Sequence, residues 1–170
     1  MLNTVKVPKK FERIFEKAES YVSAYFGNQS REFIPGKITI SGERYILVRA
    51  ASLSVDFFST VKVLFGGSLE EEAKSMAKSL LYDIAHSVGK EDARKFHIKN
   101  NLTDPLEKLS VGPVHFSYTG WASVDISPQS NVSLDENFLL IYDHLYSFES
   151  DAWLVKGEKS DSCVCVMNAG

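Results

Sequence analysis

The spacing of hydrophobic residues changes along this chain, and that change constrains its fold more than any other feature. Residues 9–26 and 69–88 repeat apolar side chains every three or four positions, which is the spacing of one helix face. Residues 37–50 are rich in β-formers, and residues 121–126 and 138–144 alternate apolar and polar side chains. Long helices combined with short strands predict an α/β (α+β) domain in which helices cover an antiparallel sheet.

Glycine and proline separate the first helix from the rest of the chain. Gly27 ends this helix, and the following segment, NQSREFIPG, has the composition of a linker. We therefore expect residues 1–34 to form a helix with its linker and residues 35–170 to form the main domain. The first helix packs either on its own domain or on a partner chain, and the sequence leaves both open.

Further glycine and helix-capping residues predict a hairpin and a long helix. KITIS and RYILVRA are separated by Gly42-Glu43, and a glycine in first place favours a type II′ hairpin turn. A helix is expected over 53–65. Ser68-Leu-Glu-Glu71 is a capping box that begins the next helix, and Gly89 is expected to close it. A separate short helix is then expected over 91–101.

The second half of the chain adds two helices and a second strand pair. Asp104-Pro105 is a strong helix start, and Pro113 is expected to kink or interrupt that helix. The alternating runs on either side of the polar loop 127–137 predict an antiparallel pair. A short helix is expected over 147–157, and the last residues, CVCVMNA, form a final apolar element.

Composition restricts the function classes. The 170 residues carry a formal net charge of −3, so no basic field is available to bind nucleic acid. The N-terminus lacks the apolar run of a signal peptide, and no stretch of about 18 apolar residues could span a membrane. Two cysteines, Cys163 and Cys165, do not make a secreted disulfide framework. We expect a cytoplasmic protein with reduced thiols.

No motif in the sequence indicates a catalytic activity. Gly66-Gly67 lacks the spacing and the lysine of a phosphate-binding loop, and no Gly-x-Ser-x-Gly elbow is present. Nothing favours a pairing of either cysteine with His144 in a protease-like arrangement, although the sequence does not exclude it. We expect a protein that is not an enzyme.

The strand at 138–144 is the one segment that suggests a binding pocket. Alternation places four of its side chains on one face, and this face is aromatic with a polar tip: Phe138, Leu140, Tyr142 and His144. An apolar cleft with one or two polar groups is typical of a small-molecule site. An ordinary aromatic core with a histidine at its edge explains the same pattern.

Several blocks of the chain resemble a known sensory family. They are GERYILVRAASLSVDFF, LLYDIAHSVGKEDARKFH, DPLEKLSVGPVHFSYTGWASVDI, YSFESDAWL and CVMNAG. They resemble the N-terminal sensory domain of XylR-type activators of aromatic catabolism. From residue 105 onward they are similar to the beginning of a 4-vinyl reductase domain.

The resemblance implies a fold and a function. The fold is similar to the ligand-binding domain of nitric-oxide signalling and vesicle-tethering proteins. The family implies a bacterial transcription activator or sensor kinase in which a small aromatic or apolar ligand controls an attached output domain. It also implies a homodimer that contacts neither nucleic acid nor membrane with this domain.

The family's ligand-binding residues carry over only in part. Alignment on Ser147-Phe148-Glu149 places an aromatic residue and a tryptophan of the family at Tyr142 and His144. Alignment on Gly112-Pro113 and Gly120 places the family's phenol-binding histidine at Phe116, one residue from His115. The resemblance thus implies a pocket between the 105–120 helix and the 138–144 strand. Its candidate lining residues are Leu109, His115, Phe116, Trp121, Phe138, Leu140, Tyr142 and His144, with Tyr118 as a further candidate.

The two cysteines can be compared with the zinc ligands of the resembled family. Cys165 lies five residues before Gly170, which matches one zinc ligand of the family. The other thiolates of the family lie further downstream, and a structural zinc needs four ligands. We therefore expect this chain to be part of a longer sensor, with no cofactor here and zinc in the full-length protein. Cys163 matches no ligand and is expected to be buried.

Two other functions stay open. One is a dimerisation or interaction module without a ligand, in which the helix at 9–26 joins two chains. The other is an enzyme component related to the reduction of a vinyl group, against which the absence of a cofactor-binding motif counts.

Overall fold

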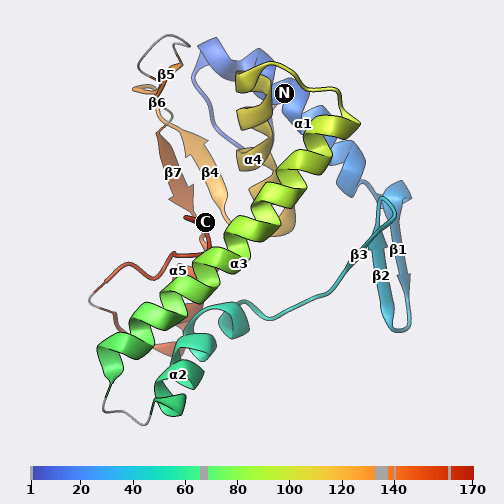
Figure 1. Ribbon diagram of the computed structural model, residues 1–170. Coiled ribbons are helices and arrows are strands. Elements are labelled where there is room, and N and C mark those ends of the chain that lie inside the picture. Colours follow the sequence, from blue (N-terminus) through green and yellow to red (C-terminus); the bar gives the residue numbers. More distant parts are fainter. Residues whose placement is uncertain (1, 66–68, 133–137, 140, 161) are drawn as a thin grey trace. The chain divides into compact units, whose positions relative to one another are not determined.

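The computed structural model describes residues 2–65, 69–132, 138–139, 141–160 and 162–170 (Figure 1). It confirms the α+β class, since the described strands all pair antiparallel and most of the remaining structure is helical. The contacts divide the chain into two units. Unit 1 is Met1–Leu47 with Ala93–Leu145, and unit 2 is Val48–Asp92 with Tyr146–Gly170.

Unit 1 is built around two packed helices. α1 (Glu12–Phe26) follows a short 3-10 turn, η1 (Lys9–Phe11), and packs against α4 (Pro105–Thr119). The first helix therefore packs within its own chain, one of the two arrangements that the sequence left open. Side chains that are fully buried come from both helices and from the strand after them: Phe15, Val22, Val114 and Val124.

α4 begins and ends where its sequence predicts. The side chain of Asp104 accepts hydrogen bonds from the backbone N–H groups of Leu106 and Glu107, and Gly120 ends the helix with a φ of 78°. Of the two outcomes expected at Pro113, a kink or an interruption, the interruption is wrong, because α4 is one helix with Pro113 buried inside it. A proline removes only one backbone hydrogen bond, and the flanking turns of α4 are held by its packing on α1.

A three-stranded sheet follows α1 and the 3-10 turn η2 (Asn28–Ser30). Its strands are β1 (Arg31–Ile34), β2 (Lys37–Ile40) and β3 (Glu43–Tyr45), in that order. Residues 31–34 were expected in a linker but form β1, because Pro35-Gly36 is a turn and not a spacer.

The second turn is also shifted by one residue from the expectation. Ile40 pairs with Glu43, so the two turn residues are Ser41 and Gly42 and not Gly42 and Glu43. Their φ angles are 49° and 85°. Two consecutive positive φ angles belong to a type I′ turn, whose twist matches that of the strands, and the predicted type II′ turn is wrong.

The second strand pair of unit 1 is confirmed. β4 (Ser123–Ile126) pairs antiparallel with β7 (Tyr142–Leu145), and Ser123 lies opposite Leu145. Inside the segment expected as a loop, β5 (Asn131–Val132) pairs with β6 (Phe138–Leu139). The N-terminal segment joins β4, since the N–H of Ile126 donates to the carbonyl of Lys6 at 2.8 Å.

Unit 2 is helical. It contains η3 (Ala50–Leu53), α2 (Val55–Leu64), the first part of α3 (Glu70–Lys99) and α5 (Phe148–Lys156). α2 and α5 agree with the helices expected over 53–65 and 147–157. They pack together, with the rings of Phe58 and Trp153 edge to face at 5.5 Å.

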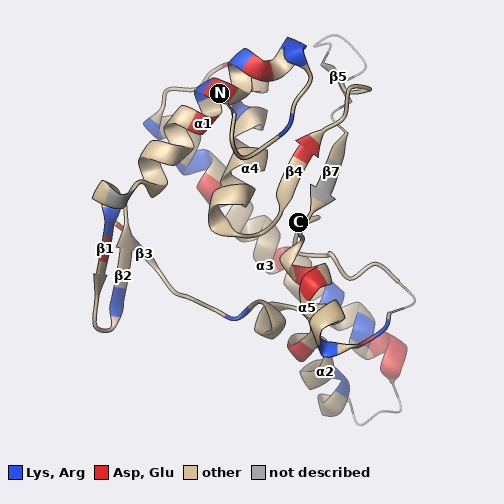
Figure 2. Ribbon diagram, turned by 180° about the vertical axis from the view of Figure 1, so that it is seen from behind, with Lys and Arg blue, Asp and Glu red and all other residues tan. Residues whose placement is uncertain are grey.

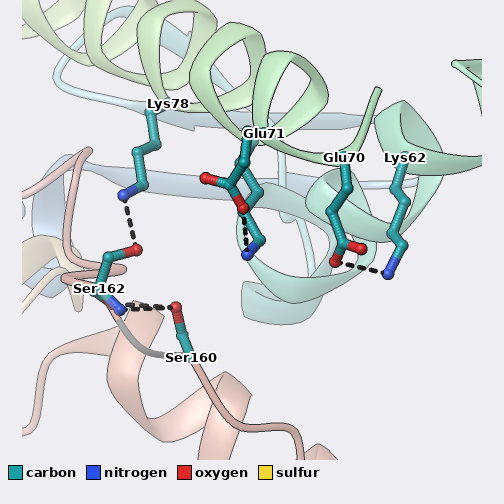
Figure 3. A network of polar contacts seen from close by, with 7 residues as sticks. Lys62, Glu70, Glu71, Lys78, Ser160 and Ser162 are labelled. Carbon is teal, nitrogen blue, oxygen red and sulfur yellow. Dashed lines mark hydrogen bonds and ion pairs between the residues drawn. The ribbon is translucent and has the colours of Figure 1, made fainter. Parts of the chain in front are cut away.

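α3 differs from its prediction. It was expected to end at Gly89 before a separate helix, but it runs unbroken for 30 residues. A glycine inside a helix costs only about 1 kcal/mol, which the helix-forming residues on both sides offset. Two exposed ion pairs lie at its start, where Lys62 reaches Glu70 at 2.7 Å and Lys74 reaches Glu71 at 3.0 Å (Figure 3).

Acidic and basic residues are interspersed along α1 and α3, whereas β2 and β4 carry one charged residue each, Lys37 and Asp125 (Figure 2). None of the helices in the described part of the chain is long and apolar enough to cross a bilayer.

Candidate functional site around His115

Three helical segments place aromatic rings around His115 in unit 1. The imidazole projects from α4, and its ring centre lies 5.5 Å from that of Phe26 at the end of α1. It lies 5.4 Å from that of Phe96, in the last turns of α3, with the two rings edge to face. His115 is half-buried between these two rings.

The cluster extends on both sides of Phe26. Tyr118, one turn of α4 after His115, stacks on Phe26 with 5.8 Å between ring centres. Tyr25 contacts Phe96 at 4.9 Å, and its hydroxyl lies 3.2 Å from the hydroxyl of Tyr45 on β3. We call this set of side chains the aromatic cluster: Tyr25, Phe26, Tyr45, Phe96, His115 and Tyr118.

The surroundings of His115 fix its charge. Burial lowers the pKa of His115 from 6.5 to about 4, because a charged imidazole loses its hydration there. At neutral pH the ring is therefore uncharged, with one nitrogen that donates and one that accepts a hydrogen bond. A neutral imidazole among aromatic rings can orient a weakly polar ligand, such as one with a hydroxyl group, without requiring a negative charge on it.

The adjacent residue faces a different neighbour. Phe116 stacks on Trp121, which follows the end of α4, with 5.7 Å between ring centres and 21° between ring planes. Successive helix residues point about 100° apart, so the side chains of His115 and Phe116 lie on different sides of α4. Leu109, two turns earlier, is partly exposed.

The strand half of the expected pocket belongs to the β4–β7 pair. Tyr142 lies opposite Ile126 and is partly exposed, and desolvation raises the pKa of its hydroxyl. His144 and Phe138 are placed by their backbones, opposite Val124 and Val132. Leu140 and the side chains of Phe138 and His144 lie outside the described residues. The pocket between the 105–120 helix and this strand therefore stays a prediction.

The sequence alone did not point to Phe26, Tyr45 and Phe96. Tyr25 was recognised only as part of a helix stripe, and Phe96 lies in the segment expected as a separate short helix. The sequence does place aromatic residues at the ends of α1 and α3 and on β3, but this pattern does not predict which of them are in contact.

Cys165 lies in unit 2 among hydroxyl groups. Its Sγ is 2.9 Å from Oγ of Ser150 and 3.5 Å from Oγ of Ser147. Cys163 is exposed, so its expected burial is wrong: the segment around it forms no regular element that could cover it.

The described residues do not fit the zinc site of the resembled family. Within that part of the chain, no three His, Cys, Asp or Glu side chains are grouped to hold a metal ion. The neighbours of Cys165 are serine hydroxyls, which are not the thiolate ligands of such a tetrahedral site.

A buried carboxylate organises the same region. Glu149 is fully buried at the start of α5. Its oxygens accept hydrogen bonds from the backbone N–H groups of Met167 and Asn168, both at 3.0 Å, and from the side-chain amide of Asn168 at 2.9 Å. Asn168 also donates to Ser147 at 2.9 Å. The carboxylate thus fastens residues 167–168 to α5.

No protein-family model matches this sequence, and no curated protein matches it.

Proposed function

We propose that the chain is a sensory domain that binds a small aromatic or apolar ligand at the aromatic cluster and does not catalyse a reaction. The observation that carries the proposal is the neutral, half-buried imidazole of His115 between the rings of Phe26 and Phe96. Aromatic side chains with one or two polar groups are the usual lining of a small-molecule site.

The chemistry of the cluster favours a planar ligand with one polar group. Aromatic rings stack on or meet one another edge to face with a gain of about 0.5–1.5 kcal/mol per pair. The imidazole of His115 adds one hydrogen bond, and the Tyr25–Tyr45 hydroxyl pair offers a second polar contact. A phenol has this combination of groups, and a simple hydrocarbon lacks the hydroxyl.

A sensor must convert binding into a change elsewhere. The aromatic cluster contains residues from α1, α3, α4 and β3, so a ligand there changes the relative stability of their arrangements. A ligand that prefers one arrangement shifts the population toward it, and an attached output domain can respond to that shift. We place this function in the cytoplasm, with no direct contact to nucleic acid or membrane.

A matched pair of ligands tests the proposal. The melting temperature of the 170-residue chain is measured with increasing p-cresol and with increasing toluene, which differ by one hydroxyl. We expect both to stabilise the chain in a concentration-dependent way, p-cresol more strongly. His115→Phe keeps the ring and removes the hydrogen bond, so it should reduce the preference for p-cresol by about tenfold in Kd.

His86→Phe is the control variant. His86 stacks on Tyr82 on an exposed part of α3, within unit 2, and belongs to no part of the aromatic cluster. It should leave both affinities unchanged. If neither compound raises the melting temperature at millimolar concentration, or if His86→Phe changes the preference as much as His115→Phe, the proposed site is wrong.

A further inference from the structure

The first residues of the chain contact α1, α4 and β4 within unit 1. Residues 2–7 form neither helix nor strand, and we call them the strap. The side chain of Val5 is only 5% exposed and belongs to the core of unit 1. Leu2 and Val7 are partly buried and pack against the same core. The strap therefore contributes aliphatic side chains to unit 1 although it is not part of a regular element.

The first half of the strap is held through its backbone. Glu19 of α1 is only 7% exposed, and its two carboxylate oxygens accept the N–H of Asn3 at 3.1 and 3.0 Å. The hydroxyl of Ser117, on α4, donates to the carbonyl of Thr4 at 3.0 Å. Neither hydrogen bond uses a strap side chain, so a different sequence on the same backbone path could form both.

The second half of the strap lies beside β4 and is also held through its backbone. The N–H of Lys6 donates to a carboxylate oxygen of Asp125 at 3.1 Å, and its carbonyl accepts the N–H of Ile126 at 2.8 Å. The ammonium group of Lys6 adds an exposed ion pair with the carboxylate of Asp125 at 3.7 Å. We call the four residues that hold the strap the strap seat: Glu19, Ser117, Asp125 and Ile126.

The edge of β4 beside the strap is only partly used. Just beyond β4, the N–H of Ser127 donates to the carbonyl of Ile141 at 2.9 Å, on the side of β7. The alternation of an antiparallel ladder then turns the backbone groups of Val124 and Ile126 to the opposite edge. Among the described residues, only the N–H of Ile126 forms a backbone hydrogen bond with the strap. An edge whose backbone groups are not all paired is a template for another strand.

The strap is an imperfect occupant of its seat. The hydroxyl oxygen of Thr4 is buried, and it has no hydrogen-bond partner among the described residues. A buried polar group without a partner destabilises the docked state. A segment with an aliphatic residue in place of Thr4, or one that pairs with more of the β4 edge, should therefore bind the strap seat more tightly than the strap does.

We propose that the strap seat is a docking site for a basic, apolar segment of a partner protein, which displaces the strap. Main-chain contacts supply affinity in this kind of recognition, and side-chain positions supply specificity. The carboxylates of Glu19 and Asp125 disfavour an acidic segment, and the core position of Val5 selects an aliphatic residue. Proline is excluded where Asn3 and Lys6 donate their N–H groups. The proposal is independent of ligand binding at the aromatic cluster.

Binding of a free peptide to a chain with a defective strap tests the proposal. The probe is the peptide LNTVKV, the sequence of residues 2–7, acetylated, amidated and fluorescently labelled. Fluorescence anisotropy gives its Kd for the full 170-residue chain. Val5→Asp should empty the strap seat, so this variant should bind the peptide about tenfold or more tightly than the unmodified chain. Circular dichroism checks that it is folded, and Val5→Ala provides the same comparison if it is not.

Altered peptides check the individual contacts. Val5→Asp in the peptide removes the aliphatic side chain, and Lys6→Pro removes the N–H that Asp125 accepts, so both should abolish measurable binding. Lys6→Glu reverses the charge of an exposed pair and should weaken binding by about threefold. Thr4→Val removes the unpaired hydroxyl and should tighten binding by about tenfold.

Val61→Asp is the matched control for the substitution in the chain. Val61 is 6% exposed and lies on α2, so it is as buried as Val5 but belongs to unit 2. It should not increase the affinity for the peptide. No binding to either Val5 variant at millimolar peptide, equal binding to Val61→Asp, or equal binding of the Lys6→Pro peptide would overturn the proposal. Dimerisation of the unmodified chain with the Val5→Asp chain, tighter than peptide binding, would show a second copy as the occupant and would also refute it.

Discussion

Replacement of Glu149 by glutamine is expected to destabilise the folded chain by about 2 kcal/mol at pH 7. The carboxylate accepts three hydrogen bonds, one from Met167 and two from Asn168. Glutamine has nearly the same shape but only one oxygen, so its amide group must face at least one backbone donor. A buried donor that loses its acceptor costs about 1–3 kcal/mol.

Burial of the charged Glu149 carboxylate lowers the stability of the folded chain, whereas its hydrogen bonds raise it. Desolvation raises the pKa of Glu149, and the hydrogen bonds from Met167 and Asn168 oppose that rise only in part. Because the folded pKa is above the unfolded value of 4.5, this group contributes more stability at low pH, and the contribution falls as pH rises through the folded pKa. The loss caused by Glu149→Gln should therefore be larger at pH 4.5 than at pH 8.

Urea unfolding followed by circular dichroism measures these differences. A loss of about 2 kcal/mol corresponds to a melting temperature lower by about 4–8 °C for a chain of this size. Glu71→Gln is the matched control, because Glu71 is exposed and its ion pair with Lys74 is worth less than about 0.5 kcal/mol (Figure 3). If Glu149→Gln is as stable as the unmodified chain at pH 7, the desolvation cost outweighs the hydrogen bonds and the reasoning is wrong.

Two other predictions concern unit 1. Because the folded pKa of His115 is about 4, below the unfolded value of 6.5, its neutral form contributes stability that is complete above pH 6.5 and is lost toward pH 4, by about 3 kcal/mol at most. Urea unfolding of the unmodified chain and of His115→Phe at pH 7 and pH 4.5 measures it, and equal pH dependence in both would contradict it. Asp104→Ala removes the acceptor for Leu106 and Glu107 and should cost about 1 kcal/mol in the same assay, whereas Asp104→Asn should cost less than half of that.

Local pattern predicted which elements exist better than where they end. The periods of three to four and of two correctly indicated α1, α2, α5 and the β4–β7 pair. Gly89 and Pro113 were wrongly predicted as breaks in a helix. A glycine or a proline inside a helix costs about 1–3 kcal/mol, and the flanking helical turns and the packing of the helix offset that cost. The turn at Ser41-Gly42 was misplaced by one residue, since serine is a less obvious candidate for a positive φ than glycine.

The aromatic cluster could not be predicted in the same way. His115 meets Phe26 and Phe96, and these residues come from three helical segments that are separated in sequence. Helix periodicity says which residues share one face, but it does not say which two faces meet. The hydrogen bond from Asn168 to Glu149 could not be predicted either, since a glutamate in the first turn of a helix is usually exposed to solvent near the helix N-terminus.

His115 and Phe116 are the residues at which the alignment with the resembled family was ambiguous, and they make different contacts. Phe116 stacks on Trp121, whereas His115 contacts Phe26 and Phe96. A ligand that uses the imidazole must therefore reach the side of α4 that faces the ends of α1 and α3. A ligand held between α4 and the 138–144 strand would meet Phe116 if that side faces the strand. On the proposed function, His115→Phe should reduce the preference for a hydroxyl group by about tenfold in Kd, and Phe116→Leu should leave that preference intact.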